Sequence, residues 1–432
     1  MPAASATQAV LASWSFPPWI TALNLFAALI YLRGWLVLHA RLPGQFTTAR
    51  LCAFLGGLAT LQVALASPID AFDPFLLANH MIQHMLLMMI VPPLVLLGDP
   101  AIPMLHGLPQ WTVRYFFGPI LRAKPAAPLG RGVTSPPVAL VLVSLATIGW
   151  HLSGPYELAL QSSAWHETEH ASFLIAALIF WWPVIQPWPS RARRDSWMLV
   201  IYLLLADFVN SAVSAFLVFS ERIYYPSYAL MPRLGGITAQ NDQAAAGMIM
   251  WVIGGFAYLI PAAAITVRLL SPLTPRAERP ASPLVERSGS RWLLIAAFML
   301  PLAAMCYGAL APETIDIDED IVRAQAVAGP LHISVFTPRE GVAGGKMDVA
   351  VLVQDEKSGS VILDSDVAVA VGAKAAGNGD LEFVRAGHER AQNKLLSTAV
   401  LNLPQTGEME LRVSVRRSGD NKMLVCDLPM GR

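Results

Sequence analysis

The stretch NHMIQHMLLMMIVPPLVLLGDP (79–100) places two histidines, His80 and His84, at the head of an apolar run long enough to cross a membrane. A second stretch, WHETEHASFLIAALIFWWP (165–183), starts in the same way with His166 and His170. Residues four apart lie on one face of an α-helix, so each pair directs two imidazoles toward the same point. Because ionisable groups are costly inside a bilayer, the two pairs predict a functional site, and their spacing suits a metal ion.

The composition predicts a multi-pass membrane protein. Of the 432 residues, 55% are hydrophobic and 14% are charged, and the mean hydropathy is +0.50. An ordinary soluble protein is less apolar, and a run of about 20 apolar residues is enough to span a bilayer. We expect eight membrane segments, at residues 18–40, 51–66, 76–97, 136–152, 168–187, 197–219, 244–270 and 291–310.

The distribution of basic residues predicts the orientation of these segments. Arginine and lysine are frequent in the loops after the first, third, fifth and seventh segments, as at Arg41, Lys124, Arg193 and Arg276, and are scarcer in the loops between. The positive-inside rule therefore places the N-terminus outside, and an even number of segments returns the C-terminal region to the same side. The formal net charge is zero, so nothing here indicates nucleic-acid binding.

This orientation brings several polar residues to one depth, in the outer half of the membrane. The third and fifth segments begin there with the two histidine pairs, and the fourth ends there with its own histidine. The seventh segment begins at the same face. Lipid cannot satisfy such groups, so they are expected to face the inside of the bundle. Five histidines converge at this depth as candidate metal ligands: His80, His84, His151, His166 and His170.

Each of these residues also has a structural interpretation, because a polar side chain in a membrane helix can hydrogen-bond to a neighbouring helix. The same applies to Asp207 and Asn210, which lie one turn apart in the sixth segment. Imidazole suits zinc, copper and iron alike, whereas a thioether favours copper(I), and Met88 follows His84 by one helical turn. Copper is therefore the preferred ion, with Met88, Asp207 and Asn210 as candidate accessory residues.

Two other functions fit part of the pattern. His166-Glu167-Thr168-Glu169-His170 matches H-E-x-x-H, in which two histidines bind zinc and the glutamate is the general base of a metalloprotease. That interpretation leaves His80 and His84 without a role. A haem-binding cytochrome is the other alternative, although two imidazoles on one helix face address a single ion better than the two faces of a porphyrin.

Several separate motifs occur in order along the chain: His80-Met-Ile-Gln-His84, Leu97-Gly98-Asp99-Pro100, Trp150-His151, Trp181-Trp182-Pro183 and Asp242-Gln243. In these motifs, the region from about residue 18 to 270 resembles the CtaG-type (caa3-type) cytochrome c oxidase assembly factors of bacteria. The resemblance implies a non-enzymatic protein of the cytoplasmic (inner) membrane that supplies copper to the active-site copper centre of a haem-copper oxidase. On this resemblance the five histidines would hold copper transiently, and Asp242 and Met250 would complete the metal site. The partners would be oxidase subunits or another copper chaperone, besides the lipid bilayer.

The composition changes after about residue 312, where short runs of alternating hydrophobicity predict strands at 331–337, 346–355, 360–371, 381–386, 394–403, 408–417 and 422–428. Such strands indicate a small immunoglobulin-like sandwich, which we expect to dock a partner. The predicted fold is an all-α membrane bundle of seven core helices and one tethering helix, followed by this all-β domain. The expected domains are an external segment (1–17), the membrane domain (18–272), a cytoplasmic linker (273–290), the eighth helix (291–311) and the external, periplasmic sandwich (312–432).

Overall fold

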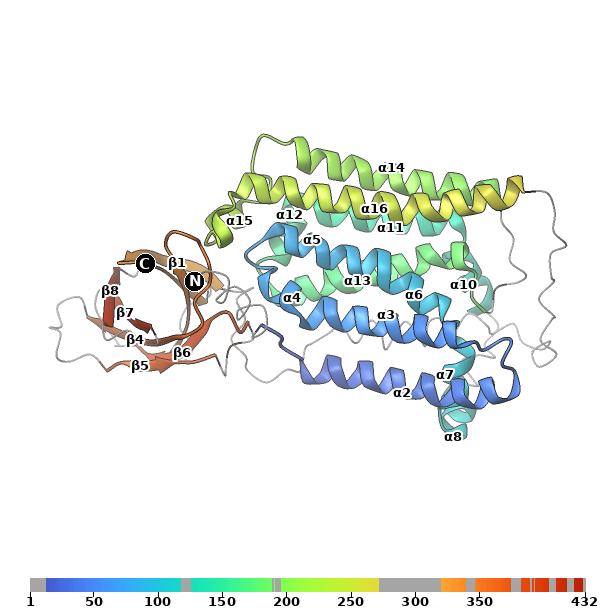
Figure 1. The fold of residues 1–432 in the computed structure, drawn as a ribbon, viewed down its shortest axis with the longest axis horizontal. Helices are drawn as coiled ribbons and strands as arrows, with labels where there is room; N and C mark the ends of the chain where they lie inside the picture. Colours follow the sequence, from blue (N-terminus) through green and yellow to red (C-terminus); the bar gives the residue numbers. More distant parts are fainter. Residues whose placement is uncertain are drawn as a thin grey trace.

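The helices lie side by side in one bundle, and the strands form a separate domain at one end of it (Figure 1). This arrangement is seen in a computed structural model of the chain. The structure describes residues 13–117, 126–188, 190, 196–271, 320–338, 346–373, 382–388, 391, 393–403, 409–417 and 423–429. The predicted eighth helix, the cytoplasmic linker and most of the external N-terminal segment lie outside these residues.

Within the described residues, six helical units are long and apolar enough to cross a membrane, and a bent pair can supply a seventh span. The straight units contain α2 (Pro18–Arg41), α3 (Thr48–Ala66) with α4 (Pro68–Phe72), α5 (Leu77–Met85) with η1 (Leu86–Ile90) and α6 (Val91–Leu97), α13 (Ser163–Ile185), α14 (Trp197–Phe219) and α16 (Ala239–Leu270). The bent pair is α11 (Pro136–His151) and α12 (Ser153–Ala159), which meet at 77°. Each of the first seven predicted segments coincides with a helix, and the count of seven core membrane helices stays a prediction.

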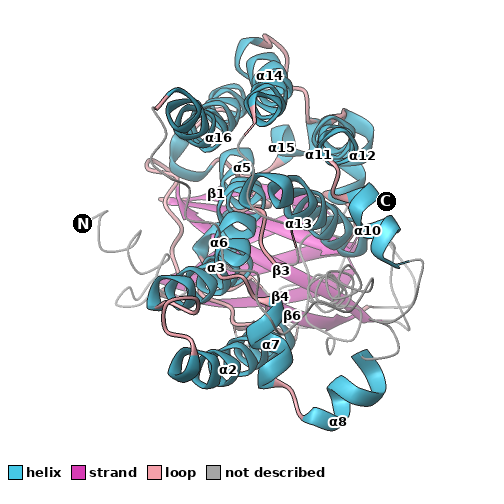
Figure 2. Ribbon diagram, turned by 90° about the vertical axis from the view of Figure 1, so that its right-hand side faces the viewer, coloured by secondary structure: helices cyan, strands magenta, loops and turns pink. Residues whose placement is uncertain are grey.

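Shorter elements lie at the two ends of the bundle. At the end away from the strands are α7 (Ala101–Gly107), α8 (Gln110–Thr112), η2 (Val113–Phe117) and α10 (Ala126–Val133), and at the strand end are α15 (Pro226–Leu230) and η3 (Leu234–Gly236). Seen along the helix axes, α5 and α13 occupy the middle, with α14 and α16 on one side and α2 and α3 on the other (Figure 2). The helices α5 and α13, which carry the two histidine pairs, thus lie side by side at the centre, and their spans are the most buried.

The third span contains one wide helical turn, η1, directly before two prolines. The carbonyl of Met88 would normally accept a hydrogen bond from the amide four or five residues later, but both positions, Pro92 and Pro93, lack an N–H group. The indole Nε1 of Trp181 on α13 donates to this carbonyl instead, at 2.9 Å. A side chain of the fifth span therefore supplies the hydrogen bond that the third span cannot make for itself.

Replacing Trp181 with phenylalanine is expected to lower the free energy of unfolding by about 1 to 3 kcal/mol, because it leaves the buried Met88 carbonyl without a donor while keeping most of the apolar volume. Reversible unfolding in mixed micelles would measure the loss. Trp251→Phe is the matched control, since Trp251 is an exposed position on α16 and should change stability little. Equal stability of the two variants would contradict this role of Trp181.

The motif Gly98-Asp99-Pro100 closes the same span at the end of the bundle away from the strands. Asp99 has a left-handed φ of 50°, and its carboxylate accepts hydrogen bonds from the Arg50 guanidinium at 2.9 Å and from the Trp188 amide at 2.8 Å. The Tyr31 hydroxyl donates to the Gly98 carbonyl at 2.7 Å. This motif therefore fixes how α2, α3 and α6 meet, far from the histidines.

The C-terminal domain consists of two four-stranded antiparallel sheets, in the orders β1-β2-β3-β6 and β5-β4-β7-β8. The strands are β1 (Asp320–Ala328), β2 (Leu331–Pro338), β3 (Lys346–Asp355), β4 (Ser365–Ala373), β5 (Val384–Ala386), β6 (Ser397–Asn402), β7 (Met409–Arg417) and β8 (Met423–Pro429). The all-β domain and seven of its strands are confirmed, β1 was not predicted, and the immunoglobulin-like type stays a prediction.

The sheet containing β2 and β3 is buried on both faces. Val335, Val351 and Val353 point between the sheets and belong to the core of the sandwich. Their neighbours Phe336 and Leu352 point outward and are also buried, because they pack against Phe75 and other residues of the helical bundle. Alternate residues of a strand lie on opposite faces, so one set builds the domain and the other docks it onto the bundle.

Candidate metal centre

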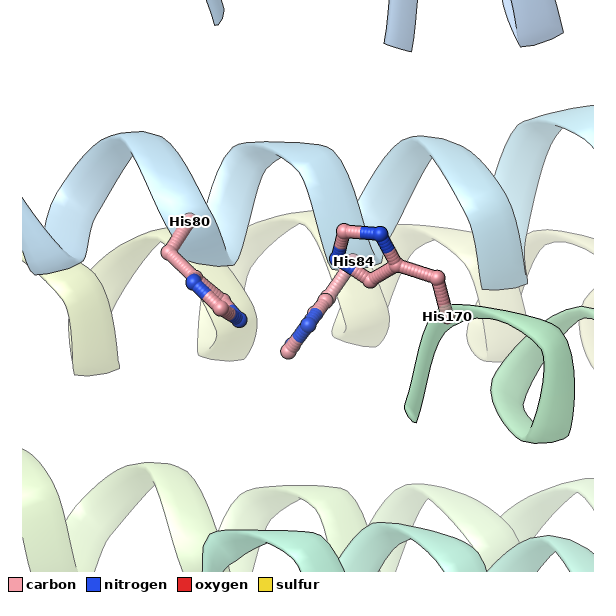
Figure 3. A group of neighbouring side chains, drawn as sticks. All are labelled: His80, His84 and His170. Atoms are coloured by element: carbon pink, nitrogen blue, oxygen red, sulfur yellow. The ribbon is translucent and has the colours of Figure 1, made fainter. Parts of the chain in front are cut away.

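Five histidines from three helical elements meet at the end of the bundle that faces the C-terminal domain. His80 and His84 project from α5, His166 and His170 from α13, and His151 from the last turn of α11. Figure 3 shows the rings of His80, His84 and His170 between the two central helices. The structure thus brings together all five histidines of the predicted site.

The rings are in contact with one another. The ring centroids of His80 and His84 are 4.2 Å apart, and that of His170 lies 5.3 Å from His84 and 5.8 Å from His80. His80, His84 and His170 can each place one nitrogen within 4.8 Å of the others, and all three are buried. This spacing suits a single ion, whereas bis-histidine haem places its two imidazoles on opposite faces of a porphyrin, so the haem alternative gains no support.

Polar contacts at the far side of two rings decide which nitrogen is free to bind an ion. His151 Nδ1 lies 2.7 Å from the Thr147 carbonyl, which can only accept, so Nδ1 carries the proton and Nε2 is left with a lone pair. His80 Nδ1 makes an ion-pair contact with Asp73 Oδ1 at 2.6 Å, which turns Nε2 of this ring away from Asp73. Metal-binding histidines are usually oriented by such a second hydrogen bond, so both rings are prepared as ligands.

Glu169 is a functional candidate that the sequence-based site did not contain. Its carboxylate is fully buried, accepts no hydrogen bond from any described residue, and lies 3.7 Å from His80 Nε2 and 3.6 Å from His84 Nε2. The metalloprotease alternative requires Glu167 instead, so the position of this carboxylate does not support it. His166, Glu169 and His170 are spaced at i, i+3 and i+4, which places all three on one helix face. This spacing was the signal in the sequence from which Glu169 could have been added to the predicted site.

Asp73 is the second carboxylate that the predicted site lacked. It follows α4, is 1% exposed, and has its two oxygens 2.6 Å from His80 Nδ1 and 3.4 Å from His166 Nε2. Asp73, His80 and His166 also form a group with ligand atoms within 4.8 Å of one another. In the sequence Asp73 is one of two acidic residues in a short loop, and no spacing connected it to the histidines.

The Asp242 carboxylate accepts hydrogen bonds from the backbone at the start of α5. Its Oδ2 accepts the amide N–H of Leu77 at 2.7 Å and its Oδ1 that of Ala78 at 3.0 Å, so the carboxylate of α16 caps the helix that carries the first histidine pair. The next residue, Gln243, binds the Tyr224 amide and the Arg222 carbonyl. Asp242 thus lies outside both three-residue groups found among the described residues.

Of the remaining predicted residues, Met250, Asn210 and Met88 take part in hydrogen bonds between helices. Met250 is buried in the core, and its carbonyl accepts a hydrogen bond from Asn210 Nδ2 at 3.1 Å. Asn210 packs against Gly254, where a Cβ atom would lie 2.3 Å from the amide nitrogen. The carbonyl of Met88 is bound by Trp181, and Asp207 is half-buried on α14. Asn210 therefore joins α14 to α16 in the manner of the structural interpretation.

Comparison with known proteins relates the helical part of the chain to one family. The sequence model of the family described as "Cytochrome c oxidase caa3 assembly factor (Caa3_CtaG)" matches residues 29–271, which is more than half of the chain. The chain is 26% identical over 253 residues to uncharacterized protein Mb0105 of Mycobacterium bovis and to uncharacterized protein MT0111 of Mycobacterium tuberculosis. Uncharacterized protein ML1998 of Mycobacterium leprae is 25% identical over 249 residues.

These alignments cover 55–56% of this chain and 36–37% of the mycobacterial proteins. The chain therefore spans little more than a third of the length of the curated relatives it matches. No solved structure matches the chain.

Proposed function

Because the chain belongs to the cytochrome c oxidase caa3 assembly factor family, we propose that it binds copper at the histidine cluster and supplies it to the copper centre of a haem-copper oxidase. Copper is the cargo of this protein, held transiently and then released. The partners are oxidase subunits or a second copper chaperone. The protein is not an enzyme, and it lies in the bacterial cytoplasmic membrane with the cluster and the C-terminal domain toward the periplasm.

One observation carries the proposal: a set of buried polar atoms without hydrogen-bond partners among the described residues, all belonging to the histidine cluster or to the carboxylate beside it. They are His80 Nε2, His84 Nδ1 and Nε2, His151 Nε2, His170 Nε2 and both oxygens of Glu169. Unsatisfied polar atoms are rare in protein interiors, and a buried carboxylate is costly unless a cation accompanies it. A bound metal ion would take one nitrogen from each of His80, His84 and His170, and the Glu169 carboxylate lies within 3.7 Å of two of these rings.

The donor atoms fit copper as cargo better than as a permanent cofactor. Imidazole binds copper(I) and copper(II), and an imidazole site releases the ion more readily than a closed thiolate cage. In a tetrahedral site two ligand atoms lie about 3.3 Å apart, and the two Glu169–imidazole separations, 3.6 and 3.7 Å, are close to this value. Two buried carboxylates, Asp73 and Glu169, also supply charge to balance the ion.

The test is metal analysis and an optical spectrum of the purified full-length chain, alone and after loading with copper(I). The chain should retain copper and show no Soret band. The double variant His80→Ala/His84→Ala should retain at least about tenfold less copper while still inserting into the membrane, because it removes two imidazoles from the centre of the cluster. Cells that depend on this chain should then lose cytochrome c oxidase activity.

His39→Ala is the matched control, since His39 lies near the far end of α2 and binds the Phe46 carbonyl there. It should leave copper content and oxidase activity unchanged. Normal copper content in the double variant would contradict the assignment of the site, and a preference for zinc together with peptide hydrolysis would restore the protease alternative.

A further inference from the structure

We propose that docking of the C-terminal domain sets the geometry of the copper cluster through Asp73, so that displacing the domain lowers the affinity for copper. The inference rests on the proposed function and deepens it by naming what regulates the site. Asp73 acts here as a positioning residue for His80 and His166. Figure 1 shows the domain next to α4, α5 and α15, the elements that surround this residue.

The first line of contact runs along the chain on both sides of Asp73. Two residues before it, the Ala71 carbonyl accepts a buried hydrogen bond from Asn393 Nδ2 of the C-terminal domain at 2.7 Å. Two residues after it, the Phe75 ring stands edge-on to Phe336 of β2, with centroids 6.2 Å apart. The domain therefore holds the segment on either side of Asp73, and the carboxylate between them contacts His80 and His166.

A second line of contact reaches Asp73 from α15. Gln354 of β3 donates to the Arg233 carbonyl at 3.2 Å, and the Gly235 amide donates to the Gly359 carbonyl at 3.3 Å. The Arg233 guanidinium in turn binds the Tyr228 carbonyl. The Tyr228 hydroxyl, which is buried, donates to the Asp73 carbonyl at 3.2 Å and lies 3.5 Å from His80 Nδ1.

The fit between domain and bundle is close enough to make the two lines act together. Gly359, at a φ of +64°, lies against the Arg233 carbonyl, where an added Cβ atom would be only 2.8 Å away. Ala71, Phe75 and Leu234 of the bundle share one buried apolar cluster with Phe336 and Leu352 of the domain. Undocking would expose this cluster and free both segments that hold Asp73, so the contact between its carboxylate and His80 would lose its fixed geometry.

The size of the effect follows from what such a carboxylate does at a metal site. A residue that orients a metal-binding histidine typically changes metal affinity by about 10- to 100-fold when it is removed. Asp73→Asn should therefore weaken copper binding by at least about tenfold. An undocked domain should weaken it by a similar factor, since both changes remove the same constraint on His80.

Leu352→Asp in the full-length chain tests the proposal. Leu352 is buried in the interface and points away from the sandwich core, so an aspartate there disfavours docking and leaves the domain folded. Val425→Asp is the matched control, because Val425 lies on β8 with 47% of its surface exposed. Phe336→Ala is a milder second variant in case Leu352→Asp does not accumulate.

Two readouts are required for each variant. Amide hydrogen exchange between residues 69 and 80, measured without copper, should become at least about tenfold faster in Leu352→Asp and stay unchanged in Val425→Asp. The dissociation constant for copper(I) should rise by about tenfold in Leu352→Asp and in Asp73→Asn. The double variant Leu352→Asp/Asp73→Asn should bind copper no more weakly than either single variant, because both substitutions act on one constraint.

Unchanged exchange in both interface variants would overturn the proposal, as would faster exchange with unchanged copper affinity. Fully additive losses in the double variant would also overturn it, since the domain would then act by a route independent of Asp73. If the wild-type chain binds no copper at all, the proposed function fails, and the exchange measurement still decides whether docking holds the Asp73 segment.

Discussion

Asp242→Ala is expected to lower the free energy of unfolding by about 3 to 6 kcal/mol. The carboxylate is 2% exposed and accepts the first two amides of α5, those of Leu77 and Ala78. A hydrogen bond to a charged group contributes about 1.5 to 3 kcal/mol, and alanine removes two of them and leaves two donors unsatisfied in the interior. Yield of folded protein in the membrane and unfolding in mixed micelles would measure the loss.

Asp242→Asn is the control, because one amide oxygen keeps part of the cap and should retain about half of the lost stability. The same pair of variants tests whether Asp242 binds the ion. If Asp242 only caps α5, the protein that folds in each variant should bind copper(II) with the same ligands as the wild type. Its electron paramagnetic resonance spectrum should then be the same as that of the wild type. A changed set of ligands in that spectrum would place Asp242 in the coordination shell.

Glu169→Gln is expected to stabilise the protein without copper and to destabilise it with copper. Without the ion, glutamine removes a buried charge that accepts no hydrogen bond from the described residues, which should add about 1 to 3 kcal/mol. With copper at about 100 times its dissociation constant, binding stabilises the wild type by about 2.7 kcal/mol, and most of this gain should be missing in the variant. Thermal unfolding with and without copper(I) should therefore rank the two proteins in opposite orders.

Glu167→Gln provides the comparison within the same helix. The substitution is identical and lies two residues away, so it should leave the copper-dependent rise in unfolding temperature as it is in the wild type. It is also the variant that would abolish zinc-dependent hydrolysis if the H-E-x-x-H stretch were a protease site. A Glu169→Gln protein that is less stable than the wild type in both conditions would show that this carboxylate has a structural partner.

The membrane helices and the histidine cluster were predictable because each depends on a pattern that is local in the sequence. Apolar length defined the spans, and four-residue spacing put His80 with His84 and His166 with His170. The alternation of basic and less basic loops then predicted that both histidine pairs and His151 lie at the same depth in the membrane. None of these steps needed to know which helices are neighbours.

Asp73 and Asp242 show where this reasoning stops. Asp73 reaches His80 from a separate short element, and Asp242 caps α5 from a helix more than 160 residues later. Only packing brings such groups together. Asp242 entered the predicted site through the family resemblance, and no spacing connected Asp73 to the histidines. The strand β1 was missed because IVRAQAVA (321–328) alternates only weakly, and the outward face of β2 and β3 gave no sign of docking because strands buried on both faces simply look apolar.

The bond from Trp181 to the Met88 carbonyl has a consequence for the making of the protein. The two residues are 93 positions apart, so at about 5 to 20 residues per second the ribosome completes the acceptor roughly 5 to 20 s before the donor. During that interval the Met88 carbonyl has no hydrogen-bond donor within its own span, so we expect it to stay near water, lipid headgroups or the insertion machinery. The fifth span supplies the missing donor, and the same helix brings the second histidine pair to the first.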